Sequence, residues 1–128
     1  MSKKIIITDR APSPVGPYSQ AVEANGFLFI SGQIAIDPST GNLVKDSIEE
    51  ETRQIIENIK AILEARGLSL ENIVDTTIFI TDIDFFPAVN KVYGAYFKEG
   101  SAPARKTVAV KDLPLGARVE IAAIAVVV

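Results

Sequence analysis

Two stretches of this chain are apolar on both faces of the strands that they are expected to form. In residues 27–30 aromatic and aliphatic side chains alternate, and in residues 119–127 every side chain except that of Glu120 is apolar. Successive side chains of a strand point to opposite faces of the sheet, so both faces here need cover. A large exposed apolar patch is unusual on a soluble monomer. We therefore expect helices on one face and another copy of the chain on the other. The alternative, a sheet curled on itself, would have to be built from very few strands.

The rest of the pattern predicts three short strands, a helix, a strand, a helix and two strands. Ser47 and Glu50 have the spacing of a capping box at the start of the first helix, and Gly67 ends it. Its buried stripe is predicted to be Ile48, Thr52, Ile55, Ile56, Ile59, Ile62 and Leu63. The second helix begins near Pro87, which suits a first turn. Two such helices can cover one face of a mixed sheet, so we expect a single α+β domain over residues 1–128. The strands that the pattern locates are residues 5–8, 27–31, 73–81, 105–110 and 119–127.

The composition excludes several kinds of chemistry. The chain has neither cysteine nor histidine, so disulfides, thiolate catalysis and imidazole chemistry are excluded, and we expect no metal site. The net charge of −3 disfavours nucleic acid and anionic membrane as partners. The apolar run at 121–128 is too short to cross a bilayer, and the start of the chain lacks the core of a signal peptide. We therefore expect a cytoplasmic protein.

Two charged residues inside predicted strands stand out: Arg105 occupies a position otherwise suited to an apolar or threonine side chain, and Glu120 lies in a strand whose other side chains are all apolar. Arg105 follows the rigid segment 102–104, and its planar fork suits bidentate capture of a carboxylate or phosphate. The alternative is a solvated arginine or a structural ion pair. Glu120 could orient or deprotonate a water molecule. The alternative for Glu120 is a structural pair with Arg118 or Arg105, which the strand pattern alone favours.

Three further polar residues are weaker candidates, because each has an ordinary structural interpretation. Tyr18 follows the proline-rich loop at 11–17, Ser31 ends a strand before Gly32, and Asn90 stands beside the apolar stripe of the second helix. The chain has no glycine-rich phosphate loop. It also has no histidine to activate a serine, which excludes a Ser-His hydrolase.

Four stretches, spread over nearly the whole sequence, match motifs of one known family. They are residues 14–20 (PVGPYSQ), 29–34 (FISGQI), 102–105 (APAR) and 119–125 (VEIAAIA). In these motifs, their order and their spacing the chain resembles the reactive intermediate deaminase family RidA, called YjgF in older usage. The resemblance implies a chorismate-mutase-like α+β fold, a homotrimer, and one ligand site in each cleft between subunits.

The resemblance also implies an activity and roles for individual residues. Members of this kind hydrolyse 2-imino acids such as 2-iminopropanoate and 2-iminobutanoate, released as enamines such as 2-aminoacrylate by pyridoxal-phosphate enzymes, to 2-oxo acids and ammonia without a cofactor. Arg105 would bind the substrate carboxylate, Glu120 would position the attacking water and move protons, and Tyr18 would line the cleft and donate a hydrogen bond. Polar contacts or backbone N–H groups would come from Ser31, Gly32, Asn90 and Thr107.

Two positions depart from the family pattern. Some members have cysteine where this chain has Thr107, and many have a second acid where it has Ala122. A mechanism for this chain must therefore be built on Glu120 alone. Three other functions stay open: a non-catalytic protein that binds small carboxylates, a ribonuclease or translation inhibitor, and a chaperone-like holdase. Glu120 beside Arg105 disfavours a binder of anions, and the acidic balance without a basic stripe disfavours a ribonuclease.

Overall fold

In the computed structural model, which describes residues 2–128, six strands form one sheet in the order β1-β2-β3-β6-β4-β5. Neighbouring strands are antiparallel except for β4 and β5, which are parallel. The mixed sheet that the sequence predicts is thus confirmed. The strands are β1 (Lys4–Ile6), β2 (Ala21–Ala24), β3 (Phe27–Gln33), β4 (Ile73–Ile80), β5 (Ala104–Ala109) and β6 (Val119–Val126).

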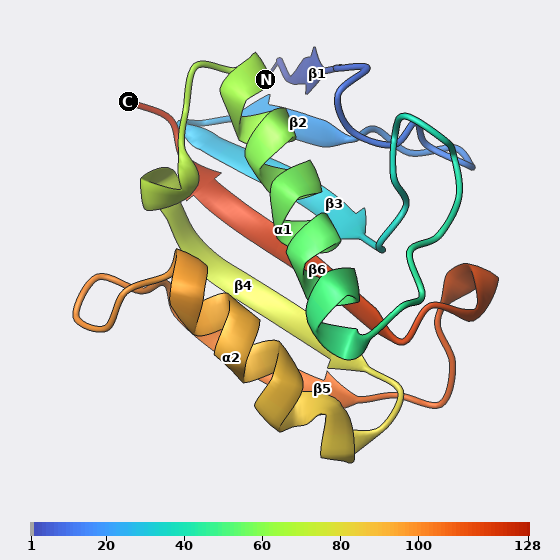
Figure 1. The fold of residues 1–128 in the computed structure, drawn as a ribbon. Coiled ribbons are helices and arrows are strands. Elements are labelled where there is room, and N and C mark those ends of the chain that lie inside the picture. Colours follow the sequence, from blue (N-terminus) through green and yellow to red (C-terminus); the bar gives the residue numbers. More distant parts are fainter. Residues whose placement is uncertain (1) are drawn as a thin grey trace.

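Both helices lie on the same face of the sheet, as Figure 1 shows. They are α1 (Ile48–Ala65) and α2 (Phe86–Tyr96), and three short 3₁₀ turns, η1 (Leu70–Asn72), η2 (Ile83–Phe85) and η3 (Pro114–Gly116), lie in the connections. The parallel strands β4 and β5 are connected through α2, because parallel neighbours cannot be joined by a hairpin. The predicted order of elements and the placement of both helices on one face are confirmed.

The ends of α1 follow from local chemistry. The Ser47 hydroxyl accepts a hydrogen bond from the Glu50 N–H at 3.0 Å, as the sequence predicts. The reciprocal half of the capping box is wrong, since the Glu50 carboxylate pairs instead with Arg53 one turn further on. After the last turn, Gly67 has φ +76°, the left-handed conformation in which glycine commonly ends a helix.

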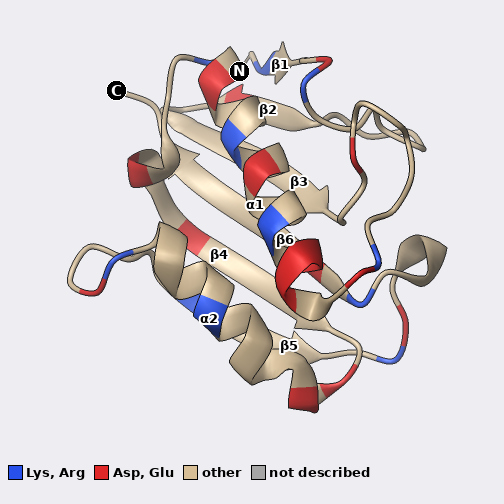
Figure 2. Cartoon of the chain, in the orientation of Figure 1, with Lys and Arg blue, Asp and Glu red and all other residues tan. Residues whose placement is uncertain are grey.

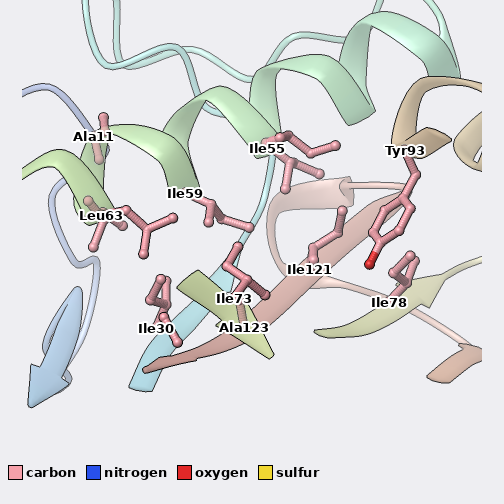
Figure 3. Packing of buried hydrophobic residues seen from close by; sticks show 14 of the residues in the cluster. Ala11, Ile30, Ile55, Ile59, Leu63, Ile73, Ile78, Tyr93, Ile121 and Ala123 are labelled. Carbon is pink, nitrogen blue, oxygen red and sulfur yellow. The ribbon is translucent and has the colours of Figure 1, made fainter. Parts of the chain in front are cut away.

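The core lies between the two helices and the sheet face beneath them (Figure 3). The predicted stripe of α1 is buried throughout, and on α2 Val89, Val92 and Tyr93 are buried while Tyr96 and Phe97 are only partly covered. Burial of large aliphatic side chains contributes roughly 1.5–3 kcal/mol each. The labelled side chains that meet in this layer include Ile55, Ile59 and Leu63 of α1, Ile30 of β3, Ile73 and Ile78 of β4, and Ile121 and Ala123 of β6.

Among residues 2–128 no helix covers the opposite face of the sheet, which we call the open face. Phe27 and Phe29 of β3 lie on it with ring centroids 6.3 Å apart and exposed fractions of 42% and 45%. Val74 and Val108 are exposed to a similar degree. Apolar side chains on both faces of the strands, inferred from the sequence, are therefore observed, and one of the two apolar faces is left for another surface to cover.

Candidate active site

Glu120 points to the open face from the middle strand β6. Its backbone is paired with Phe79 on β4, and its side chain is half-buried. Among residues 2–128 it makes no hydrogen bond or ion pair, so the structural partners considered from the sequence are not found. Arg118 pairs instead with Glu51, and Arg105 bonds to Asn90. Burial raises the pKa of the Glu120 carboxyl above its ordinary value.

A buried carboxylate at the start of α1 fixes the beginning of β6. Glu51 is fully buried and accepts hydrogen bonds from the backbone N–H groups of Arg118 (2.8 Å) and Val119 (3.2 Å) and from Arg118 Nε (2.9 Å). These donors satisfy the charge, which would otherwise be costly to bury. The bonds hold the two residues immediately before Glu120. The sequence gives no indication of this role for Glu51, because a partner 67 residues away leaves no local signal.

A bulge in β3 places Ser31 and Gly32 against Glu120. The register of β3 on β6 shifts between Ile30 and Gln33, and bulges of this kind redirect side chains at functional sites. The Ser31 hydroxyl donates to the backbone carbonyl of Ser19 at 2.6 Å. Gly32 lies so close to the Glu120 carboxylate that a Cβ built on it would be 2.8 Å from the carboxyl carbon. Only glycine leaves that carboxylate in place.

Tyr18 completes this group of residues from the loop before β2. Its hydroxyl accepts a hydrogen bond from the Val15 N–H at 3.3 Å, which leaves the O–H proton to donate to a ligand. Tyr18, Ser31, Gly32 and Glu120 line one cavity of about 340 Å³, which we call the Glu120 cavity. The structure thus brings together four of the seven residues predicted for the site.

Arg105 lies on the edge strand β5 and is held by α2. Its Nη1 donates to Asn90 Oδ1 at 2.8 Å, and its guanidinium carbon lies 4.9 Å from the centroid of the Tyr93 ring and 5.4 Å from that of Phe86. Contacts of this kind orient a guanidinium without using its donors. Arg105 and Asn90 line a second, open cavity, the Arg105 cavity. The sequence does not indicate these two rings as site residues, because Tyr93 fits the apolar stripe of α2 and Phe86 precedes the helix start expected near Pro87.

The ring of Tyr93 is itself anchored. Its hydroxyl hydrogen-bonds with the Thr76 hydroxyl on β4 at 2.8 Å, with both groups buried. Burial raises the Tyr93 pKa, although the bond to Thr76 and the nearby Arg105 charge oppose that shift. The hydroxyl therefore stays protonated at neutral pH and keeps the ring in place beneath Arg105.

Thr107 lies two residues beyond Arg105 on the same edge strand. The Val110 N–H donates to the Ile80 carbonyl of β4, and N–H directions alternate along a strand, so the Thr107 N–H faces the outer edge of the sheet. This direction agrees with the predicted backbone donor. The Thr107 side-chain oxygen is buried and has no hydrogen-bond partner among the described residues.

The two groups of candidate residues lie on opposite faces of the sheet. Arg105 is in register with Thr76 of β4, whose side chain is buried beneath the helices. Glu120 is in register with Phe79, an odd number of residues along β4 from Thr76, and so points to the other face. Within one chain the Arg105 cavity and the Glu120 cavity therefore share no lining residue.

Apart from Arg105 and Glu120, the charged residues of the described chain do not assemble a further candidate site. Figure 2 shows acidic and basic residues interspersed along α1 and a mostly uncharged sheet behind it. Residues 2–128 contain no cluster of three or more acidic side chains arranged to hold a metal ion. No helix in the described part of the chain is both long and apolar enough to cross a membrane.

The contact between Gly32 and Glu120 gives a testable prediction. Gly32→Ala should retain the fold, because the added methyl meets the mobile end of a side chain, but it should displace the Glu120 carboxylate. For the reaction proposed below, kcat/KM should fall by about 10²-fold. The measurement is kcat/KM with a melting curve alongside. In the double variant with Glu120→Gln the alanine should cost nothing further. Additive losses would show that Gly32 acts independently of Glu120.

Comparison with known proteins places this arrangement in a family. The family model described as Endoribonuclease L-PSP matches residues 8–127. A mouse (Mus musculus) protein named 2-iminobutanoate/2-iminopropanoate deaminase is 47% identical over 124 residues, which cover 97% of this chain and 91% of that protein.

Solved structures agree in fold over nearly the full length. A protein of the conserved Rid family, YyfA from Yersinia pestis, is 52% identical with a TM-score of 0.95, covering 98% of this chain and 100% of that chain. TdcF from E. coli, solved with bound serine, is 45% identical with a TM-score of 0.90, covering 96% and 98% respectively. The chain therefore belongs to the RidA (YjgF) family, the family to which the Endoribonuclease L-PSP model corresponds.

Proposed function

We propose that this protein hydrolyses 2-imino acids, and the enamines that tautomerise to them, to 2-oxo acids and ammonia. The observation that supports the proposal most is the Glu120 carboxylate, which lines an open cavity, half-buried and without a partner among the described residues. A carboxylate with a pKa raised by burial is suited to accept and return a proton. The mouse relative is named for a deamination of 2-imino acids, a reaction in which such a carboxylate can transfer protons.

The proposed site needs two subunits. Arg105 and Glu120 lie on opposite sheet faces of one chain, so both can contact one small substrate only if the β5 edge of one subunit meets the open face of another. Phe27 and Phe29 are exposed on the open face, and contact with another subunit would remove their apolar surface from water. We propose a homotrimer with one such site in each cleft, as the family resemblance implies.

The proposed chemistry uses few groups because a protonated imine is already electrophilic. Arg105 of one subunit holds the substrate carboxylate, and Glu120 of its neighbour accepts a proton from water as the water oxygen bonds to C2. The C=N π electrons move onto nitrogen and give a 2-amino-2-hydroxy acid. Glu120 returns its proton to that nitrogen and the C–N bond breaks. The hydroxyl then loses its proton to the departing ammonia, which leaves the 2-oxo acid and ammonium.

Tyr18 and the backbone groups complete the proposed site. The Tyr18 O–H can donate to the developing hydroxyl, and the Thr107 N–H at the sheet edge can donate to the substrate carboxylate beside Arg105. Ser31 and Asn90 act mainly by holding other groups, since their side chains already bond to the Ser19 carbonyl and to Arg105.

A coupled assay tests the proposed function directly. A dehydratase that releases 2-aminoacrylate from serine would be mixed with the protein, and formation of pyruvate would be followed. We expect pyruvate to form faster than without the protein. An unchanged rate, with pyruvate still binding to the protein, would instead support a non-catalytic carboxylate-binding protein.

RNA cleavage is the alternative that the family's description suggests. It would need a basic surface for the phosphate backbone. The chain has 13 basic and 16 acidic residues, and on the face that Figure 2 shows they are interspersed. No specific feature of the described residues favours RNA, so imine hydrolysis is the function that we argue.

The proposed trimer gives a second prediction. The protein should sediment and scatter light as a trimer at micromolar concentration and should not yield a stable folded monomer, because the apolar open face would then be exposed to water. Phe29→Glu should weaken assembly, since it places a charge on that face. A well-folded monomer in light scattering would contradict both the interface and the shared site.

A further inference from the structure

The Glu120 cavity extends well beyond the residues that the proposed reaction uses. Its volume is about 340 Å³, whereas the side chain of 2-iminopropanoate is a single methyl group. Five of the residues that line its wall carry apolar side chains and come from three loops. They are Pro12, Val15, Ile34, Ile36 and Pro114.

The two amide side chains in this wall, Gln20 and Gln33, are already engaged within the protein, and the remaining polar side chain outside the site residues is the uncharged hydroxyl of Ser13. The Gln20 amide accepts from the Thr8 N–H and donates to the carbonyls of Thr8, Ala11 and Pro12. Gln33 Nε2 donates to the Ser31 carbonyl at 3.1 Å. No lysine or arginine is among the lining residues. A charged substituent entering this space would be desolvated without a partner, whereas an alkyl group would be buried at a gain.

The apolar wall is held from behind by a buried amide. Asn58 of α1 is 1% exposed, and its Nδ2 donates to the Ile36 carbonyl at 2.9 Å, while Gln54 donates to its Oδ1 at the same distance. Ala35, between the two isoleucines, is fully buried and its carbonyl accepts from the Val44 N–H at 2.8 Å. The side chains of Ile34 and Ile36 are therefore presented to the cavity by a fixed backbone, and they remain partly exposed there.

Resting on the function proposed above, we propose that the best substrates are 2-imino acids with an uncharged alkyl side chain of about the size of leucine's, and that Ile34 and Ile36 determine this specificity. With the carboxylate on Arg105 and C2 beside Glu120, the remaining substituent of C2 extends along the apolar wall. Each methylene buried there is expected to raise kcat/KM about fourfold. A leucine-derived imine, with three more carbons than the alanine-derived one, should gain at least tenfold.

The test compares three imines generated in place by amino-acid oxidases, from alanine, leucine and glutamate, with semicarbazide trapping the imine that escapes hydrolysis. For the wild type we expect kcat/KM for the leucine imine to exceed that for the alanine imine at least tenfold, and the glutamate imine to be the poorest substrate. Ile36→Phe, which fills the cavity, should lower the leucine-to-alanine ratio at least tenfold. Ile83→Phe, at an exposed isoleucine outside this cavity, is the matched control and should leave the ratio unchanged.

A second variant avoids any dependence on core packing. Val15 is 71% exposed on its loop, so Val15→Lys should fold normally and place a cation at the rim of the wall. This variant should raise the ratio of kcat/KM for the glutamate imine to that for the leucine imine at least tenfold. The proposed specificity would be overturned if the wild-type ratio of kcat/KM for the leucine and alanine imines were below tenfold, or if neither variant changed its ratio. Imine hydrolysis itself would then still stand. If the protein hydrolysed none of the three imines, the proposed function would be overturned as well.

Discussion

Arg105→Lys should lower kcat/KM for a 2-imino acid nearly as much as Arg105→Ala does, by a hundredfold or more. The guanidinium is held by Asn90 and by the rings of Tyr93 and Phe86, and its remaining donors form a planar fork. A lysine ammonium keeps the charge but not this geometry. Charge-assisted hydrogen bonds contribute ~1.5–3 kcal/mol each, so losing a bidentate pair accounts for the predicted loss.

Binding and stability separate this role from a structural one. Pyruvate is unreactive here but presents the same carboxylate, so titration by NMR should show weaker binding in both Arg105 variants. Their melting temperatures should stay near that of the wild type, because Arg105 is exposed and forms no ion pair among residues 2–128. Unaltered pyruvate affinity, with a stability loss that lysine partly restores, would assign Arg105 a structural role.

Glu120→Gln should remove most turnover, on the order of 10²–10⁴-fold, while pyruvate still binds. The amide has nearly the same shape as the carboxylate but cannot accept a proton from water. Because Glu120 has no partner among the described residues, the substitution strands no other group. Turnover at the wild-type rate would show that Glu120 does not act on the water.

The raised pKa of Glu120 adds a signature in pH. A base acts when deprotonated, so wild-type turnover should rise with pH through that pKa, and the residual activity of Glu120→Gln should lack this rise. The contribution of Glu120 to the free energy of unfolding should change in the opposite direction, falling as pH rises. A carboxyl whose pKa is raised on folding stabilises the fold below its unfolded pKa of ~4.3, and that contribution is lost as pH rises through the folded pKa. Glu120→Gln should therefore melt above the wild type at neutral pH, with the difference shrinking in acid.

Much of the fold can be predicted from the sequence because its signals are local. The Ser47 cap, the buried stripe of α1 and the Pro87 start of α2 each depend on residues within one or two turns. The sequence predicts three strands before α1 but gives the positions of only two, and the strand that it does not locate is β2 (Ala21–Ala24). It is only four residues long and includes Glu23, whose charge is balanced by Arg66 at the end of α1. A partner so distant in sequence gives no local pattern.

The candidate site could be predicted as residues but not as an arrangement. The strand and loop pattern indicates Arg105, Glu120 and Tyr18, and the motif resemblance implies their roles, yet neither indicates that Arg105 and Glu120 point to opposite faces. That depends on β4 lying between β6 and β5 and on the registers of both pairings, which are tertiary properties. Glu51 and Asn58 were missed for the same reason, because the backbone groups that they bind belong to other elements.

The division of Arg105 and Glu120 between two sheet faces has a consequence for mixed populations of subunits. If each site takes Arg105 from one subunit and Glu120 from its neighbour, two inactive variants can restore activity to each other. An Arg105→Ala subunit still supplies an intact Glu120, and a Glu120→Gln subunit still supplies an intact Arg105. On unfolding and refolding together in equal amounts, random assembly into cyclic trimers would leave about a quarter of the clefts with both groups intact. A heterozygous cell could thus retain imine hydrolysis from two defective alleles, neither of which encodes a working enzyme alone.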